Sequence, residues 1–124
     1  MPFQSECEYP SGHRDAERCV LDREKLQKLE VLFGKEKYVS FMERFKRTLG
    51  MHVAAITADT TGAVDKGAQA HKIVGLAGTA GFQELSEQSM RLEHAVNENV
   101  DDLDPFIESV KAAAGRANAV LETI

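Results

Sequence analysis

The chain has no Trp, only three Pro and two Cys, and 6% aromatic residues. None of its apolar runs approaches the roughly 20 residues that a membrane-spanning helix needs, and its first residues lack an apolar signal core. Fifteen Lys and Arg against 20 Asp and Glu give a formal net charge of −5. This balance argues against nucleic acid as the main partner, because phosphate binding needs a concentrated basic face. We therefore expect a soluble, cytoplasmic protein whose 124 residues form one domain.

Both cysteines precede the first strongly periodic segment. A disulfide between Cys7 and Cys19 would constrain only the N-terminal tail, so we expect reduced thiols. The scarcity of Pro and the many Ala, Leu, Lys and Glu residues favour helix along most of the chain. The composition therefore predicts an all-α protein.

Apolar periodicity divides the chain into a leader and a body. Residues 1–18 mix Pro, Gly and charged residues without an apolar rhythm, which predicts a flexible N-terminal leader, and residues 19–124 are expected to form a helical bundle. In the body, helical stripes occupy residues 22–33, 38–56, 63–80, 82–96 and 104–124. Because the turns between them are short, we predict an antiparallel up-and-down four-helix bundle with a short additional N-terminal helix.

Several residues mark the expected ends of these helices. Asp22 is a plausible N-cap, and Gly34 and Gly81 stand where helices commonly stop. Asp104 is expected to cap the last helix, with Pro105 at the first helical position. The stripes predicted to face the core include Leu26, Leu29, Leu32, Phe33, Tyr38, Phe41, Met42, Phe45, Leu49, Val53, Ile56, Ala63, Lys66, Ala70, Ile73, Val74, Ala77, Phe82, Leu85, Ser89, Leu92, Val96, Phe106, Val110, Ala113, Ala117, Val120 and Ile124.

His71 is predicted to lie between the buried stripe and the solvent face of its helix. A single surface His has no functional meaning by itself. Gly75 and Gly78, however, are predicted to lie on the same strip of the helix surface, between the buried stripe and the solvent face. Each glycine in a helix interior costs on the order of 1 kcal/mol relative to Ala. Close helix packing could explain the glycines. A helix surface without side chains, which a partner protein can approach closely, could explain them as well. The second explanation suits a nucleophile that another protein must reach.

Glu93 is the second candidate, because it falls beside the apolar stripe of the following helix. If the two helices form a hairpin about Gly81, His71 and Glu93 lie at comparable heights. Glu93 would then accept a hydrogen bond from Nδ1–H of His71 and leave the lone pair on Nε2. An exposed Glu93 paired with a Lys or Arg is an equally good interpretation of the spacing.

The segment HKIVGLAGTAGF at residues 71–82, followed by Leu85 and the Leu92-Glu93 pair, resembles the histidine-containing phosphotransfer (HPt) family. The pattern of that family is H-x-L-K-G-x-A-x-x-x-G, followed by spaced Leu and a Leu-Glu pair. The resemblance extends to Asp22, Leu29, Gly34 and the region of Phe45, and so covers the body after the leader. It implies that the phosphorylated histidine is His71, the glycine facing the receiver is Gly75, the packing alanine is Ala77, the hairpin glycine is Gly81 and the acid bonded to the imidazole is Glu93.

This sequence departs from the family at one charged position. The Lys that usually stands three residues after the histidine is Val74 here. Lys72 adjoins His71 but is predicted to project a further quarter turn toward solvent, so it does not simply replace that charge. The expected docking residues for a receiver are Lys72, Val74, Gly75 and Gly78.

The resemblance implies a monomeric phosphorelay carrier that accepts a phosphoryl group on His71 from a receiver-domain aspartate and passes it to another receiver. Its partners would be response-regulator receivers, alone or as part of a hybrid histidine kinase, and the only Mg²⁺ would sit on the receiver. No G-x-x-x-x-G-K-[ST] loop is present, so phosphorylation from ATP is not expected. The alternative is a helical adaptor that binds partners through the same groove and never carries phosphate.

The remaining histidines and basic residues have simpler interpretations. His13 is assigned to the leader, and His52 and His94 to helix surfaces. No histidine of the body follows a Glu by three residues, as a di-iron bundle requires, and the cysteines lack zinc-finger spacing, so no metal or cofactor is expected. A basic cluster, read as a solvated face or as a rim for an acidic partner, consists of Lys35, Lys37, Arg44, Lys46 and Arg47.

Overall fold

The computed structural model describes residues 20–122, and within that range the regular structure is entirely helical. The helices are α2 (Arg23–Phe33), α3 (Lys35–Thr57), α4 (Ala63–Ala80), α5 (Gln83–Asn97) and α6 (Asp104–Leu121). This agrees with the all-α class that the composition predicts. The predictions for the leader at residues 1–18, for Cys7, Cys19 and His13, and for Ile124 fall outside the described residues.

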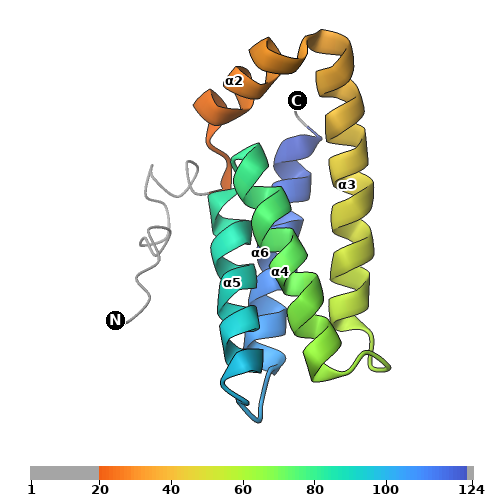
Figure 1. The fold of residues 1–124 in the computed structure, drawn as a ribbon, viewed down its shortest axis with the longest axis vertical. Coiled ribbons are helices and arrows are strands. Elements are labelled where there is room, and N and C mark those ends of the chain that lie inside the picture. The colour runs from red at the N-terminus through yellow and green to blue at the C-terminus, as the bar shows by residue number, and fades with distance from the viewer. Residues whose placement is uncertain (1–19, 123–124) are drawn as a thin grey trace.

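The long helices α3, α4, α5 and α6 run lengthwise beside one another, and α2 lies across one end (Figure 1). α4 packs on α5, α5 on α6, and α3 on both α4 and α6. The core fills the space between them, and its centre is a stacked pair of rings. Phe45 of α3 and Phe82, which precedes α5, are fully buried with ring centroids 5.1 Å apart.

The expected end of α4 is confirmed at Gly81, which adopts a left-handed conformation with φ of 89°. The Gly81 carbonyl accepts a hydrogen bond of 2.8 Å from the backbone N–H of Asp22. A Cβ on Gly81 would lie only 2.9 Å from the Asp22 carbonyl oxygen. The start of α2 is therefore fixed against the turn between α4 and α5, and glycine is required there for both conformation and space.

Two predicted caps have different outcomes. Asp22 caps α2, because its carboxylate accepts the N–H of Lys25 at 3.2 Å. Asp104 is not a cap: it is the first residue of α6, and its own N–H donates to the Asp102 carboxylate at 3.1 Å. The predicted cap was wrong by one position, because the helix begins at Asp104 and the carboxylate of Asp102 accepts the hydrogen bond from its N–H.

Most of the predicted stripe is buried, the remaining described members are half-buried, and two are exposed. Leu32 has 76% of its surface exposed, because α2 lies across the end of the molecule and only its Leu26 is buried. Ala63 is exposed as well, since it is the first residue of α4. None of the helices within residues 20–122 combines the length and apolar character needed to cross a membrane.

Candidate functional site

His71 and Glu93 face each other from adjacent helices. Nδ1 of His71, on α4, lies 2.6 Å from Oε2 of Glu93, on α5. The side chain of His71 is 72% exposed and that of Glu93 is 23% exposed. Of the two interpretations that the spacing of Glu93 left open, the structure shows the contact with His71, with the imidazole open to solvent and the acid largely covered.

This contact determines which imidazole nitrogen can react. An ionised carboxylate only accepts hydrogen bonds, so the nitrogen that faces Glu93 carries the proton. In the neutral ring, the lone pair then resides on Nε2. The carboxylate also stabilises positive charge that develops on the ring when Nε2 forms a bond. The pair therefore has the arrangement of an oriented and electrostatically assisted nucleophile.

A shallow hollow surrounds this pair. Its lining consists of Val64, Gly67, Ala68, His71, Lys72, Glu93, Val96 and Asn97. Lys72 is exposed, as predicted, and it also lines the same hollow as the imidazole. Lys72 was predicted to be a docking residue that does not simply replace the missing family Lys, yet its cationic side chain belongs to the immediate surroundings of His71.

The glycines of α4 serve different purposes. A Cβ on Gly67 would lie 2.9 Å from Cγ1 of Val96, so this glycine allows α4 and α5 to approach closely. A Cβ on Gly78 would meet Oγ of Ser86 at 3.5 Å, an ordinary contact, and a Cβ on Gly75 would meet nothing within 4 Å. Packing therefore explains Gly67 and leaves Gly75 unexplained. Gly67 was missed from the sequence, although it stands one helical turn before His71.

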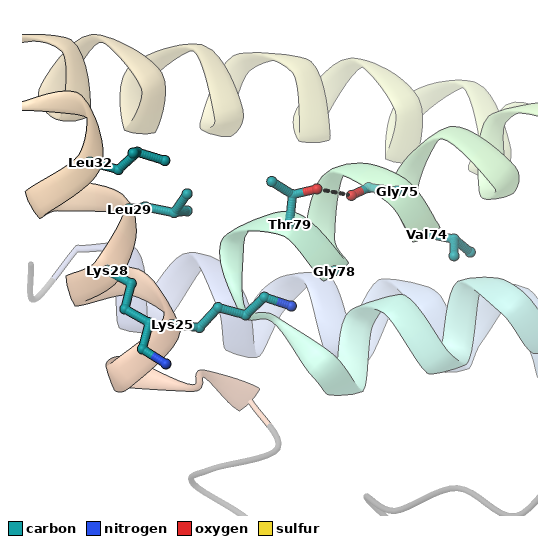
Figure 2. Close-up of a pocket in the computed structure, with 8 residues that line it drawn as sticks. All are labelled: Lys25, Lys28, Leu29, Leu32, Val74, Gly75, Gly78 and Thr79. Carbon is teal, nitrogen blue, oxygen red and sulfur yellow. Dashed lines mark hydrogen bonds between the residues drawn. The ribbon is translucent and has the colours of Figure 1, made fainter.

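A second depression, here called the α2–α4 groove, lies beside the glycines. Figure 2 shows Leu29 and Leu32 pointing from α2 toward α4. The groove is lined by Lys25, Lys28, Leu29, Leu32, Val74, Gly75, Gly78 and Thr79. Of the predicted docking residues, Val74, Gly75 and Gly78 line this groove, whereas Lys72 lines the hollow around His71. Val74 is half-buried, and its carbonyl accepts a hydrogen bond of 3.0 Å from Ser86 of α5.

The prediction that His52 lies on a helix surface is wrong. Only 8% of its surface is exposed, and its Nδ1 lies 2.5 Å from Oε1 of Gln69 on α4. His52 follows Leu49 by three residues and precedes Ile56 by four, which places it on the stripe that packs against α4. That spacing was the available signal. His94 is exposed, as predicted.

Lys66, predicted to face inward, is half-buried and binds backbone carbonyls at the C-terminal end of α3. Its ammonium group donates to the carbonyls of Ile56 and of Ala58, the latter at 2.8 Å. These are carbonyls at the C-terminal end of a helix, where a cation is favourable. Lys66 therefore links α4 to α3 and is not part of the hollow around His71.

The basic cluster of α3 is exposed throughout. Lys35 and Lys46 line a separate hollow together with Tyr38 and Met42. Burial, and secondarily the carboxylate of Glu30, raises the pKa of Tyr38, so its phenol stays neutral at physiological pH. Among residues 20–122, no group of three or more His, Cys, Asp and Glu is placed to hold a metal ion.

No family model matches this chain, and the comparisons with curated proteins and with solved structures found no match either.

Proposed function

We propose that this chain is a histidine phosphotransfer protein of the HPt type. It accepts a phosphoryl group on Nε2 of His71 from the aspartate of one receiver domain and passes it to the aspartate of another, in a two-component phosphorelay. The observation that carries the proposal is the 2.6 Å contact between Nδ1 of an exposed His71 and a largely covered Glu93 carboxylate on the adjoining helix.

The chemistry requires little from this chain beyond that pair. The Nε2 lone pair attacks the phosphorus of the aspartyl phosphate, so an N–P bond forms as the P–O bond to the receiver breaks. The bonding electrons leave with the receiver carboxylate. The imidazole becomes cationic, and Glu93 stabilises that charge through the proton on Nδ1. Transfer to the next receiver reverses these steps, with Mg²⁺ held by the carboxylates of the receiver.

The arrangement of the helices supports the HPt architecture as part of the proposal. α3, α4, α5 and α6 contact one another in cyclic order, α3 on α4, α4 on α5, α5 on α6 and α6 on α3. The connections between successive helices are short. An antiparallel four-helix bundle has this neighbour relationship, and α2 corresponds to the additional N-terminal helix.

The expected setting follows from the same proposal. The partners are response-regulator receivers or a hybrid histidine kinase in the cytoplasm, and the carrier acts as a monomer without a cofactor of its own. Neither nucleic acid nor a membrane is required as a partner.

The decisive experiment is incubation with phosphorylated receivers from the source organism. We expect a label on this chain that is labile in acid and stable in alkali, as a phosphohistidine is. His71→Gln should abolish the label, while the matched control His94→Gln should retain it. Incubation with ATP and Mg²⁺ alone should give no label.

Other results would contradict the proposal. A label that survives His71→Gln would place the modification elsewhere. Absence of transfer from every receiver would favour the alternative, a helical adaptor that uses the same surface without carrying phosphate.

A further inference from the structure

The α2–α4 groove leaves apolar surface uncovered. Leu32 has 76% of its surface exposed at the groove, and Leu29 is half-buried beside it. On the α4 side, Gly75 has open space where a Cβ would stand. Removing apolar surface of this kind from water is favourable. The groove therefore gains stability when an apolar segment covers it.

Two positive charges stand at the same groove. Lys25 and Lys28 are one helical turn apart on α2, line the groove and are exposed. Within residues 20–122, neither ammonium group forms an ion pair with a carboxylate. A segment that covers the groove is therefore favoured when it carries acidic side chains beside its apolar ones.

The N-terminal leader of this chain contains such a segment. The leader as a whole has no apolar rhythm, but apolar and acidic residues alternate near its start. In an extended chain, Phe3, Cys7 and Tyr9 would share one face. Glu6 and Glu8 would share the other face, about 7 Å apart. This separation is close to the roughly 5–6 Å between side chains one turn apart on a helix, as the two lysines are.

The start of the described chain brings the leader to this groove. Leu21 is buried, and the N–H of Asp22 donates to the carbonyl of Gly81 at 2.8 Å. Gly78, which lines the groove, stands three residues before Gly81. The 13 residues from Tyr9 to Asp22 can span up to about 45 Å, whereas the 11 residues of α2 are only about 16 Å long. The leader therefore reaches the whole groove, at the high effective concentration of a tethered ligand.

We propose that the leader binds in the α2–α4 groove of its own chain, as an extended segment. Its aromatic side chains pack against Leu29 and Leu32, and its two glutamates pair with Lys25 and Lys28. The bound leader closes the groove to other proteins until it is displaced. This inference does not depend on phosphotransfer, so it and the proposed function can fail separately.

Disulfide trapping in the full chain tests the contact directly. Cys19→Ser leaves Cys7 as the only native thiol, and Thr79→Cys introduces a second thiol in the groove. The control introduces Met51→Cys instead, at an exposed position of α3 outside the groove. Oxidised glutathione joins thiols that meet, and non-reducing electrophoresis with mass spectrometry measures the intramolecular product. We expect the Thr79→Cys chain to close about 5- to 10-fold faster than the control chain.

Charge exchange tests the ion pairs. Lys25→Glu with Lys28→Glu should remove most of the advantage of the groove thiol, because attraction becomes repulsion. Adding Glu6→Lys with Glu8→Lys to the same chain should restore it, since the charges are then exchanged between the leader and α2.

A second measurement needs no introduced cysteine. A protease specific for Glu cleaves after the two leader glutamates, and the groove should protect both bonds in the wild-type chain. Lys25→Glu with Lys28→Glu should lose this protection. The matched control is Lys37→Glu with Arg47→Glu, which makes the same change in net charge at exposed positions of α3 outside the groove, and it should keep the protection.

Other results would overturn the inference. It fails if the groove thiol closes no faster than the control, or if reversing the two lysines leaves both trapping and cleavage unchanged. It also fails if exchanging the charges does not restore trapping. A covalent dimer in place of the intramolecular product would overturn it as well, because the occupant of the groove would then be the leader of a second copy.

Discussion

Nδ1 of His71 lies 2.6 Å from Oε2 of Glu93 although the two residues belong to different helices, and only the register of the α4–α5 hairpin brings them together. Gly81 sets that register by ending α4 in a left-handed conformation. His71 is thus oriented by a contact between rigid helices and not by a loop, and in the proposed function this keeps its geometry constant as different receivers approach.

Replacing Glu93 by Ala should slow phosphotransfer without unfolding the protein. The variant loses the group that orients the ring and stabilises its developing charge, and we expect a rate about 10-fold lower, which corresponds to about 1.4 kcal/mol in the barrier. Rapid-quench transfer from a phosphorylated receiver measures the rate, and circular dichroism checks the fold. Glu87→Ala on the same helix serves as a comparison. An unchanged rate for Glu93→Ala would show that the carboxylate does not take part.

Gly75→Ala should change stability and function in opposite directions. No atom lies within 4 Å of the added Cβ, so relief of the backbone entropy cost should raise the free energy of unfolding by about 0.5–1 kcal/mol. The methyl group should nevertheless obstruct the receiver and slow transfer. Gly50→Ala in α3, which also meets nothing within 4 Å, should stabilise similarly and leave transfer unchanged. Equal transfer rates for the two variants would mean that Gly75 does not face the partner.

The helices could be predicted because they depend on local patterns, whereas the spacing alone left the His71–Glu93 contact as one of two equally good interpretations. The helices are located by apolar periodicity and by the terminal residues Asp22, Gly34 and Gly81. In a hairpin about Gly81, residues at similar sequence distances from the turn lie side by side. Errors of one residue at a helix end, as at Asp104, arise when neighbouring side chains offer equivalent acceptors.

Other features depend on how the helices pack, and a single stripe does not reveal that. Leu32 has the spacing of a core residue, but α2 crosses the end of the molecule and leaves it exposed. His52 has the polarity of a surface residue, but α3 turns it toward Gln69. The different purposes of Gly67 and Gly75 emerge only when the atoms opposite each glycine are known.

Gly67→Ala should destabilise the protein, in contrast to Gly75→Ala. The added Cβ would lie 2.9 Å from Cγ1 and 3.2 Å from Cβ of Val96, and a β-branched side chain cannot easily move away. We expect the free energy of unfolding to fall by about 1–3 kcal/mol. Denaturant unfolding measures the change, and the double variant with Val96→Ala should recover part of the loss. Additive losses in the double variant would show that the two residues do not limit the approach of α4 to α5.

Lys72 should supply the positive charge that Val74 does not. It lines the same hollow as His71, so its ammonium group can approach a phosphoryl group on Nε2. Lys72→Gln should therefore slow transfer from phosphoramidate, a small donor that needs no protein surface, as well as from the receiver. Because the side chain is exposed and its charge is screened, we expect an effect of about 3- to 5-fold, in line with exposed ion pairs worth up to about 1 kcal/mol. Introducing Val74→Lys into the Lys72→Gln variant should restore the rate, since residue 74 adjoins His71 one turn along α4. If Lys72→Gln slows only the receiver reaction, Lys72 contacts the partner and not the phosphoryl group, and Val74→Lys should then give no recovery with phosphoramidate.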